Sequence, residues 1–206
     1  MSTAGVPRRP VSDLLLLAIF GLSGFAALVY QVAWQRLLFG TFGVDIESIT
    51  IIVSTFMLGL GCGSLAGGWA ADRLRHRRLE LFVLAELAIA GFGVLSTRIL
   101  PGVGTLFVSA SLPVTTLVNF GLMLVPTAMM GATLPILVAY SFERTGNVGS
   151  SIGGLYFGNT VGAALGAFFT GLLVFHFMSV DRAIYLAAAC NGIVAIAVLA
   201  AVRCAK

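Results

Sequence analysis

Six long apolar runs dominate the pattern of hydrophobic and polar positions along this chain. Charged residues gather in the short stretches between the runs and are rare inside them. The runs are long enough for helices that cross a bilayer, and they lack the alternation that is typical of barrel strands. The pattern therefore predicts an all-α membrane protein with six transmembrane helices. We expect these helices at about residues 13–39, 46–71, 79–98, 112–142, 149–176 and 182–203.

The composition agrees with this pattern and excludes an ordinary soluble domain. Of the 206 residues, 59% are hydrophobic and 10% are charged, whereas soluble domains carry about 25% charged residues. A stretch rich in Pro, Gly and Ser at 101–113 divides the chain into two three-helix units, about 1–98 and 112–203. We expect a single six-helix domain over residues 1–206, without a soluble domain.

The basic residues sort by loop rather than spreading as a nucleic-acid footprint would. Most fall on one side of the six-span topology, which places both termini in the cytoplasm and indicates a multi-pass protein of the bacterial inner membrane. The net charge of +4 is therefore no sign of a nucleic-acid partner. The cytoplasmic set is Arg8, Arg9, Arg73, Arg75, Arg77, Arg78, Arg144, Arg203 and Lys206, against Arg36, Arg98 and Arg182 on the other side.

Two of the predicted helices carry a glycine at every fourth position. Residues four apart lie on one face of a helix, so each stripe forms a groove in which another helix can approach closely. We expect the two stripes to meet across a two-fold interface between two copies of the chain. The alternative is that both stripes pack helices within one copy. The stripes are Gly59, Gly63 and Gly67 in the second helix, and Gly154, Gly158, Gly162 and Gly166 in the fifth.

A charged motif follows the second helix. The sequence Gly68-Trp69-Ala70-Ala71-Asp72-Arg73-Leu74-Arg75-His76-Arg77 resembles the cytoplasmic loop motif of the major facilitator superfamily, Gly-x-x-x-Asp-Arg-x-Gly-Arg-Arg/Lys. It matches at Gly68, Asp72, Arg73 and Arg77, and it departs at Arg75, where the motif has its second glycine. We expect Asp72 and Arg73 to cap helix ends and to hold this face together by charge-assisted hydrogen bonds.

Three further stretches, 22–36, 56–60 and 130–135, strengthen the resemblance. Together with the loop they are similar to the membrane region of bacterial fused facilitator/spermidine synthase-like proteins, over nearly the whole chain. The resemblance implies one half of a facilitator bundle, completed by a second copy at a junction made by the second and fifth helices. It also implies a soluble aminopropyltransferase-like partner. We find no Gly-rich nucleotide loop on which to base a synthase activity for this chain.

Polar side chains in the first helix are candidates for a substrate cavity. Gln31 and Gln35 lie four apart and therefore on one face. Their amides would hydrogen-bond a solute if that face points inward, and the alternative is a polar cluster at the outer membrane interface. We assign Trp34 and Arg36 to such an interface cluster, because both residue types favour that depth.

Amides in later helices have the same two interpretations. Asn119 in the fourth helix, and Asn159 with Tyr156 in the fifth, would line a central cavity if the facilitator resemblance holds. Each is equally explained by hydrogen bonding between helices, and this applies to Asn191 in the sixth helix as well.

Glu86 is a carboxylate inside a predicted span. An acid in the membrane is costly unless it is paired or hydrated, which makes Glu86 a candidate for coupling to a cation or a proton. The alternative is a structural ion pair with Arg73 or Arg77 of the basic loop.

Enzymatic chemistry and cofactors have little support in the sequence. Neither a Ser-His-Asp arrangement nor metal-ligand spacing is present, and His76 and His176 lie too far apart to form a haem site. We therefore predict no catalytic residues, no metal and no cofactor. The sequence favours a homodimeric transporter of a small polar or cationic solute, with an anchor or assembly subunit for a partner enzyme as the alternative.

Overall fold

The structure is a computed structural model that describes residues 12–42, 45–107 and 112–204. Its long helices are α1 (Asp13–Phe42), α2 (Asp45–Arg73), α3 (Arg78–Leu106), α4 (Leu112–Thr145), α5 (Val148–Phe169) and α7 (Val180–Cys204). Shorter elements join them: the 3₁₀ turn η1 (Arg75–Arg77), the π-helical segment η2 (Thr170–Val174) and the single turn α6 (Phe175–Phe177). The described residues form no strand, so the all-α class is confirmed.

Six segments of the described chain are long and apolar enough to cross a membrane, as the sequence predicts. The observed helices extend past several predicted ends. The largest difference is in α3, which continues through Pro101 to Leu106 although we expected it to end near residue 98. Proline removes one backbone donor, but its fixed φ is helical, so the helix continues with one hydrogen bond missing.

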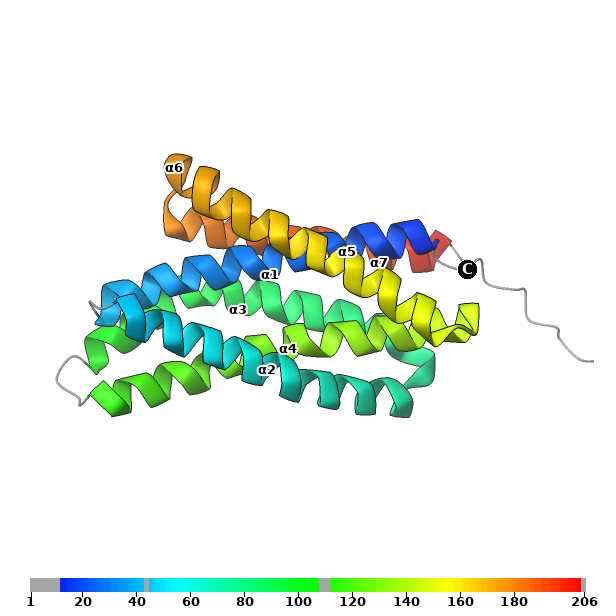
Figure 1. Cartoon of the computed structure of the whole chain (residues 1–206), viewed down its shortest axis with the longest axis horizontal. Helices are drawn as coiled ribbons and strands as arrows, with labels where there is room; N and C mark the ends of the chain where they lie inside the picture. Colours follow the sequence, from blue (N-terminus) through cyan, green and yellow to red (C-terminus); the bar gives the residue numbers. More distant parts are fainter. Residues whose placement is uncertain (1–11, 43–44, 108–111, 205–206) are drawn as a thin grey trace, which may run out of the picture.

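The helices run side by side along one long axis (Figure 1). The most extensive contacts join each helix of the first three-helix unit to one helix of the second: α1 to α5, α2 to α4, and α3 to α7. The start of α1 and the end of α7 lie at the same end of the bundle as the turn between α2 and α3 (Figure 1). We call this the basic end, because it carries Arg73, Arg75, Arg77, Arg78, Arg144 and Arg203.

The glycine stripe of α2 packs against α4 of the same chain. A methyl group added at Gly63 would collide with the backbone of Ala128, and one added at Gly67 would collide with Ala132. At Gly59 it would collide with the side chain of Thr127. The absence of side chains along this stripe is thus what allows α2 and α4 to lie in close contact.

The glycine stripe of α5 packs against α1 in the same way. Added methyl groups at Gly158, Gly162 and Gly166 would collide with Leu17, Gly21 and Phe25 respectively. Gly154 has no neighbour within 4 Å of such a methyl group. The grooves that we expected to join two copies, at Gly59, Gly63 and Gly67 and at Gly158, Gly162 and Gly166, are therefore filled by helices of one chain. Contact between copies has to use other residues.

Aromatic side chains form the core in the half of the bundle away from the basic end. Trp34 is fully buried, stacks on Tyr30 with ring centroids 4.9 Å apart, and donates a hydrogen bond from Nε1 to Ser96 Oγ at 2.8 Å. The predicted place of Trp34 at the membrane interface is wrong, because its indole N–H finds a partner inside the bundle. Arg36 is exposed and lies over the ring of Phe175 at 4.0 Å, which fits an interface position.

Candidate functional site

Glu86 is buried in the middle of the bundle and is held by two side chains from other helices. Its Oε1 accepts a hydrogen bond from Ser23 Oγ of α1 at 2.7 Å, and its Oε2 accepts one from Asn191 Nδ2 of α7, also at 2.7 Å. The alternative pairing of Glu86 with a loop arginine is wrong: Arg77 pairs with Glu80 at 3.8 Å, and Arg73 lies over the Trp69 ring.

The two donors to Glu86 are themselves acceptors. Because Ser23 donates its hydroxyl hydrogen to the carboxylate, the lone pairs of its oxygen remain available. Asn191 directs its NH₂ group to Glu86, and its Oδ1, which is buried, has no hydrogen-bond partner among the described residues. An orphaned buried acceptor is costly in an apolar bundle, so its presence beside a cavity marks a candidate binding position.

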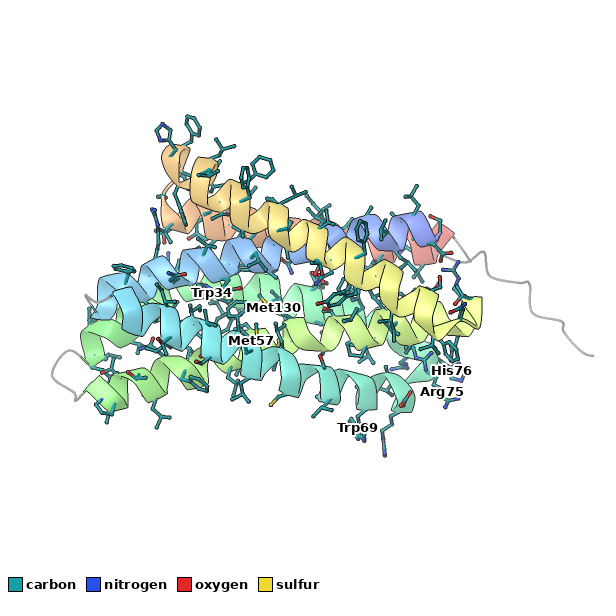
Figure 2. The ribbon with its side chains drawn as sticks, in the orientation of Figure 1. Trp34, Met57, Trp69, Arg75, His76 and Met130 are labelled. Carbon is teal, nitrogen blue, oxygen red and sulfur yellow. The ribbon has the colours of Figure 1, made fainter. Side chains whose placement is uncertain are left out.

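A cavity of about 240 Å³ adjoins this polar cluster. Ser23 and Asn191, the two donors to Glu86, line it, and so does Met130 of α4. Figure 2 labels Met130 near the middle of the bundle, far from both ends. We call this the central cavity. It lies at the depth at which many transporters bind their substrates.

The central cavity opens between α2 and α5. Of the residues that line it, Ser64 of α2 and Tyr156 of α5 are exposed, whereas those from α1 and α7 are buried or half-buried. Ser64 Oγ donates to the carbonyl oxygen of Gly131 at 3.2 Å, which keeps this side of the mouth close to α4. The mouth thus faces the side of the bundle on which α2 and α5 lie nearest the viewer in Figure 1.

Two of the predicted cavity residues, Tyr156 and Asn159, line the central cavity. Asn159 lies against α1 at Gly24, the residue after Ser23. A methyl group at Gly24 would collide with the main-chain and side-chain oxygen atoms of Asn159. The close approach of α5 to α1 therefore brings this amide next to the Ser23 and Asn191 pair.

The other predicted cavity residues lie elsewhere. Gln31 and Gln35 are half-buried on α1, and neither they nor Asn119 line the central cavity. Asn119 is fully buried and donates from Nδ2 to the carbonyl oxygen of Thr115 at 2.9 Å, one turn earlier in α4. A cavity shared by Gln31 and Asn119 therefore stays a prediction, separate from the central cavity.

The charged loop is held by an arginine outside the matched motif positions. Arg78 is 5% exposed; it donates from Nε to the carbonyl oxygen of Ala71 at 2.9 Å and from Nη1 to that of Ala139 at 2.8 Å. It also pairs with Glu143 at 2.7 Å. Arg78 thus ties together the ends of α2, α3 and α4.

The motif residues expected in that role are exposed. Asp72 has no hydrogen-bond or ion-pair partner among the described residues, and Arg73 contacts the ring of Trp69. Gly68 also lies in this last part of α2, where an added methyl group would only touch the ring of Pro135 at 3.9 Å. The expectation that Asp72 and Arg73 hold this face is corrected in favour of Arg78.

A second cavity, of about 330 Å³, lies at the basic end between α1, α4 and α5. Asp13, Ser141, Thr145 and Gly154 are among its lining residues. Asp13 pairs with Arg144 at 3.2 Å. Within the described chain, this cavity adjoins ordinary charged ends of helices rather than a buried ionisable group.

Sequence reasoning singled out Glu86 but missed its setting. Ser23 lies 63 residues before Glu86 and Asn191 lies 105 residues after it, so no local spacing connects the three. Of the two donors, only Asn191 stands out in the sequence, because it is an amide within an apolar run. Arg78 was counted among the loop charges, and nothing in the sequence distinguishes it from its exposed neighbours.

Comparison with known proteins gives one informative relative. Polyamine aminopropyltransferase 1 of Streptomyces coelicolor is 28% identical over 169 residues, which are 78% of this chain and 30% of that protein. The chain therefore spans less than a third of the length of the curated relative that it matches. No family model matches the chain, and no solved structure matches it. The similarity agrees with the spermidine synthase-like part of the resemblance stated above.

Proposed function

We propose that the chain is a half-size, facilitator-like transporter of a small cationic solute, which binds in the central cavity. The observation that carries this proposal is the buried carboxylate of Glu86, which is hydrogen-bonded to two residues that line the cavity at the middle of the bundle. An acid at this depth is expensive to keep and is therefore a default sign of a solute or ion pathway. The amine chemistry named by the Streptomyces relative supports a cation of the amine class.

The proposed orientation has both termini in the cytoplasm of a bacterium. Arginines are concentrated at the basic end, where the start of α1 and the end of α7 also lie. Lys and Arg accumulate in cytoplasmic loops of inner-membrane proteins, which supports this orientation.

The proposed working unit is a homodimer. A single bundle leaves the central cavity open at Ser64 and Tyr156, so one copy does not enclose a pathway by itself. A second copy docked on the side of α2 and α5 would cover the mouth. This contact would use the exposed side chains of α5, such as Phe157 and Phe168, since the glycine stripes already pack within the chain.

Transport and assembly are tested on the purified protein. Proteoliposomes should take up radiolabelled putrescine faster than protein-free liposomes. Glu86→Gln should lower the uptake rate to that of protein-free liposomes, whereas Glu80→Gln on the same helix should keep the wild-type rate. Native mass spectrometry of the wild type in nanodiscs should give the mass of two copies. Uptake equal to that of empty liposomes for putrescine and for a monoamine would overturn the transport proposal, and a stable monomer would overturn the dimer.

The second candidate function is a membrane subunit that assembles with a separately encoded aminopropyltransferase-like enzyme. The similarity to a polyamine aminopropyltransferase, of which this chain covers 30%, favours it. A soluble aminopropyltransferase from the same organism should then co-purify with the chain in a defined ratio. Under this proposal the enzyme docks on the membrane unit, and the chain moves no solute in the absence of the enzyme.

A further inference from the structure

We propose that the central cavity recognises an alkylammonium group through the oxygen atoms of Ser23 and Asn191, which Glu86 orients. The inference deepens the proposed function by naming the chemical group that the cavity binds, and it rests on that function only for the role of the cavity. It stands on hydrogen-bond geometry rather than on the similarity to another protein.

The direction of each hydrogen bond determines what faces the cavity. The carboxylate of Glu86 accepts from Ser23 Oγ and from Asn191 Nδ2, both at 2.7 Å, so Ser23 uses its one donor on the acid and Asn191 uses one of its two N–H donors. Each residue keeps an acceptor, namely the Ser23 oxygen lone pairs and Asn191 Oδ1. Asn191 is 2% exposed and lines the cavity, and its Oδ1 has no partner among the described residues.

A ligand group that bonds to these two acceptors must be a donor. An ammonium group has three N–H donors and no acceptor, whereas a hydroxyl would satisfy one of these oxygen atoms and an anion none. Hydrogen bonds to an ionised partner polarise a hydrogen-bond chain. Ser23 Oγ and Asn191 Oδ1 are therefore stronger acceptors than the same atoms would be without Glu86. Glu86 also supplies the negative charge that a buried cation requires, and it is bonded to both residues that make the contact.

The remainder of the cavity favours an alkyl chain on the ammonium group. Phe20, Leu60 and Leu134 give it apolar walls. Its volume of about 240 Å³ is about eight times the 30 Å³ that one molecule occupies in liquid water. The cavity thus has room for an unbranched amine of several carbons, with the polar mouth at Ser64 and Tyr156 for its far end.

One carboxylate compensates one positive charge, so a single ammonium group is the recognised unit. Among the described residues that line the cavity, none is a second acid. A diamine would therefore place its second ammonium at the mouth, near exposed Tyr156, where water can hydrate it. A quaternary ammonium has no N–H donor and leaves Asn191 Oδ1 unsatisfied.

The first experiment measures binding by calorimetry to the full chain in nanodiscs. The probes are n-butylammonium, n-butanol as its neutral analogue, and tetramethylammonium as a cation without N–H donors. We expect saturable binding of n-butylammonium, and binding of both other probes that is weaker by about tenfold or more, since each lacks a donor or the charge. Equal affinity for n-butanol, or no binding of n-butylammonium by the folded wild type, would overturn the inference.

Matched variants separate this site from general charge effects. Glu86→Gln and Asn191→Ala should each weaken n-butylammonium binding by about tenfold or more. Glu80→Gln removes an exposed acid of the same helix, and Asn119→Ala removes a buried amide outside the cavity; both should bind as the wild type does. Circular dichroism and size-exclusion chromatography show which variants keep the helical, monodisperse state.

A second measurement uses the wild type alone, so it does not depend on variants that fold. Dicyclohexylcarbodiimide reacts with protonated carboxyl groups inside membranes, and mass spectrometry locates the adduct. An ammonium bound at Ser23 and Asn191 favours the ionised form of Glu86, so n-butylammonium should slow labelling of Glu86 several-fold while n-butanol should not. Labelling that neither probe changes, or that both slow equally, would count against the inference.

The outcomes distinguish this inference from the proposed function. Binding and protection by n-butylammonium without uptake into proteoliposomes would leave the site in place and remove the transport proposal. Uptake of amines that is unchanged in Glu86→Gln and Asn191→Ala would leave transport in place and remove this site.

Discussion

The carboxylate of Glu86 on α3 accepts a hydrogen bond from the side-chain amide of Asn191 on α7 at 2.7 Å, across 105 residues of sequence. This bond fixes which end of the Asn191 amide faces the central cavity. It also connects the two helices in the middle of the bundle. The stability of the bundle and the chemistry of its cavity therefore depend on the same pair.

Asn191→Leu should destabilise the bundle, because it leaves Glu86 with Ser23 as its remaining donor. We expect the free energy of unfolding to fall by about 1–3 kcal/mol, the usual range for a buried polar group that loses a partner. Unfolding by SDS in mixed micelles measures it. Asn119→Leu is the control, since among the described residues its amide donates to the Thr115 carbonyl oxygen of its own helix and not to another helix. Equal losses in the two variants would contradict the special role of the Glu86 pair.

Arg78→Ala should loosen the basic end. The guanidinium joins Ala71, Ala139 and Glu143, so its removal takes one hydrogen bond from each of two carbonyl groups and the ion-pair partner from one carboxylate. We expect a loss of about 2 kcal/mol, together with faster hydrogen exchange in the ends of α2 and α4. Arg77→Ala breaks only an exposed pair and should cost less than about 1 kcal/mol. Asp72→Asn should leave exchange unchanged; faster exchange there would restore the motif aspartate to a structural role.

Gly162→Ala should unfold or separate α1 and α5 within one chain. Its new methyl group would collide with the backbone of Gly21, which cannot move without shifting a helix. Gly153→Ala is the control, because it has open space around it on the same helix. We expect a loss of about 1–3 kcal/mol for the first change and none for the second, by the same SDS titration. A Gly162→Ala protein that is fully stable but loses its dimer would point back to an interface between copies.

Thiol labelling should follow the central cavity rather than the outer parts of α1 and α4. In a background without the native cysteines, Ser64→Cys and Asn159→Cys should react with a water-soluble maleimide, because both positions line the cavity and are exposed or half-buried. Asn119→Cys, at a fully buried position, should stay unlabelled. Strong labelling at Asn119→Cys with protection at Asn159→Cys would reverse the assignment of the cavity.

The class of the fold follows from the sequence because the bilayer leaves few choices. A run of about 20 apolar residues has to satisfy its backbone internally, so the six helices are predictable from hydropathy alone. The glycines at Gly162 and Gly63 likewise predict that some helix approaches closely. They do not say which one, because a groove without side chains accepts a helix from the same chain as readily as one from another copy.

The side-chain contacts inside the bundle cannot be predicted from the sequence in this way. The general preference of indole for the membrane surface predicts an interface position for Trp34. Its hydrogen bond to Ser96 depends instead on how α1 and α3 are rotated against each other. The bonds of Glu86 depend on three helices at once. Side-chain type limits such contacts, but the rotation and depth of each helix decide them.

The pairing of early with late helices sets an order of events during synthesis. α3 leaves the ribosome with Glu86 long before α7 supplies Asn191, 105 residues later. At 5–20 residues per second this delay is about 5–20 s. During that time the acid has Ser23 as its available donor, and α3 lacks α7, the helix with which it makes its most extensive contacts. A nascent chain that stops before α7 therefore leaves Glu86 without the Asn191 donor.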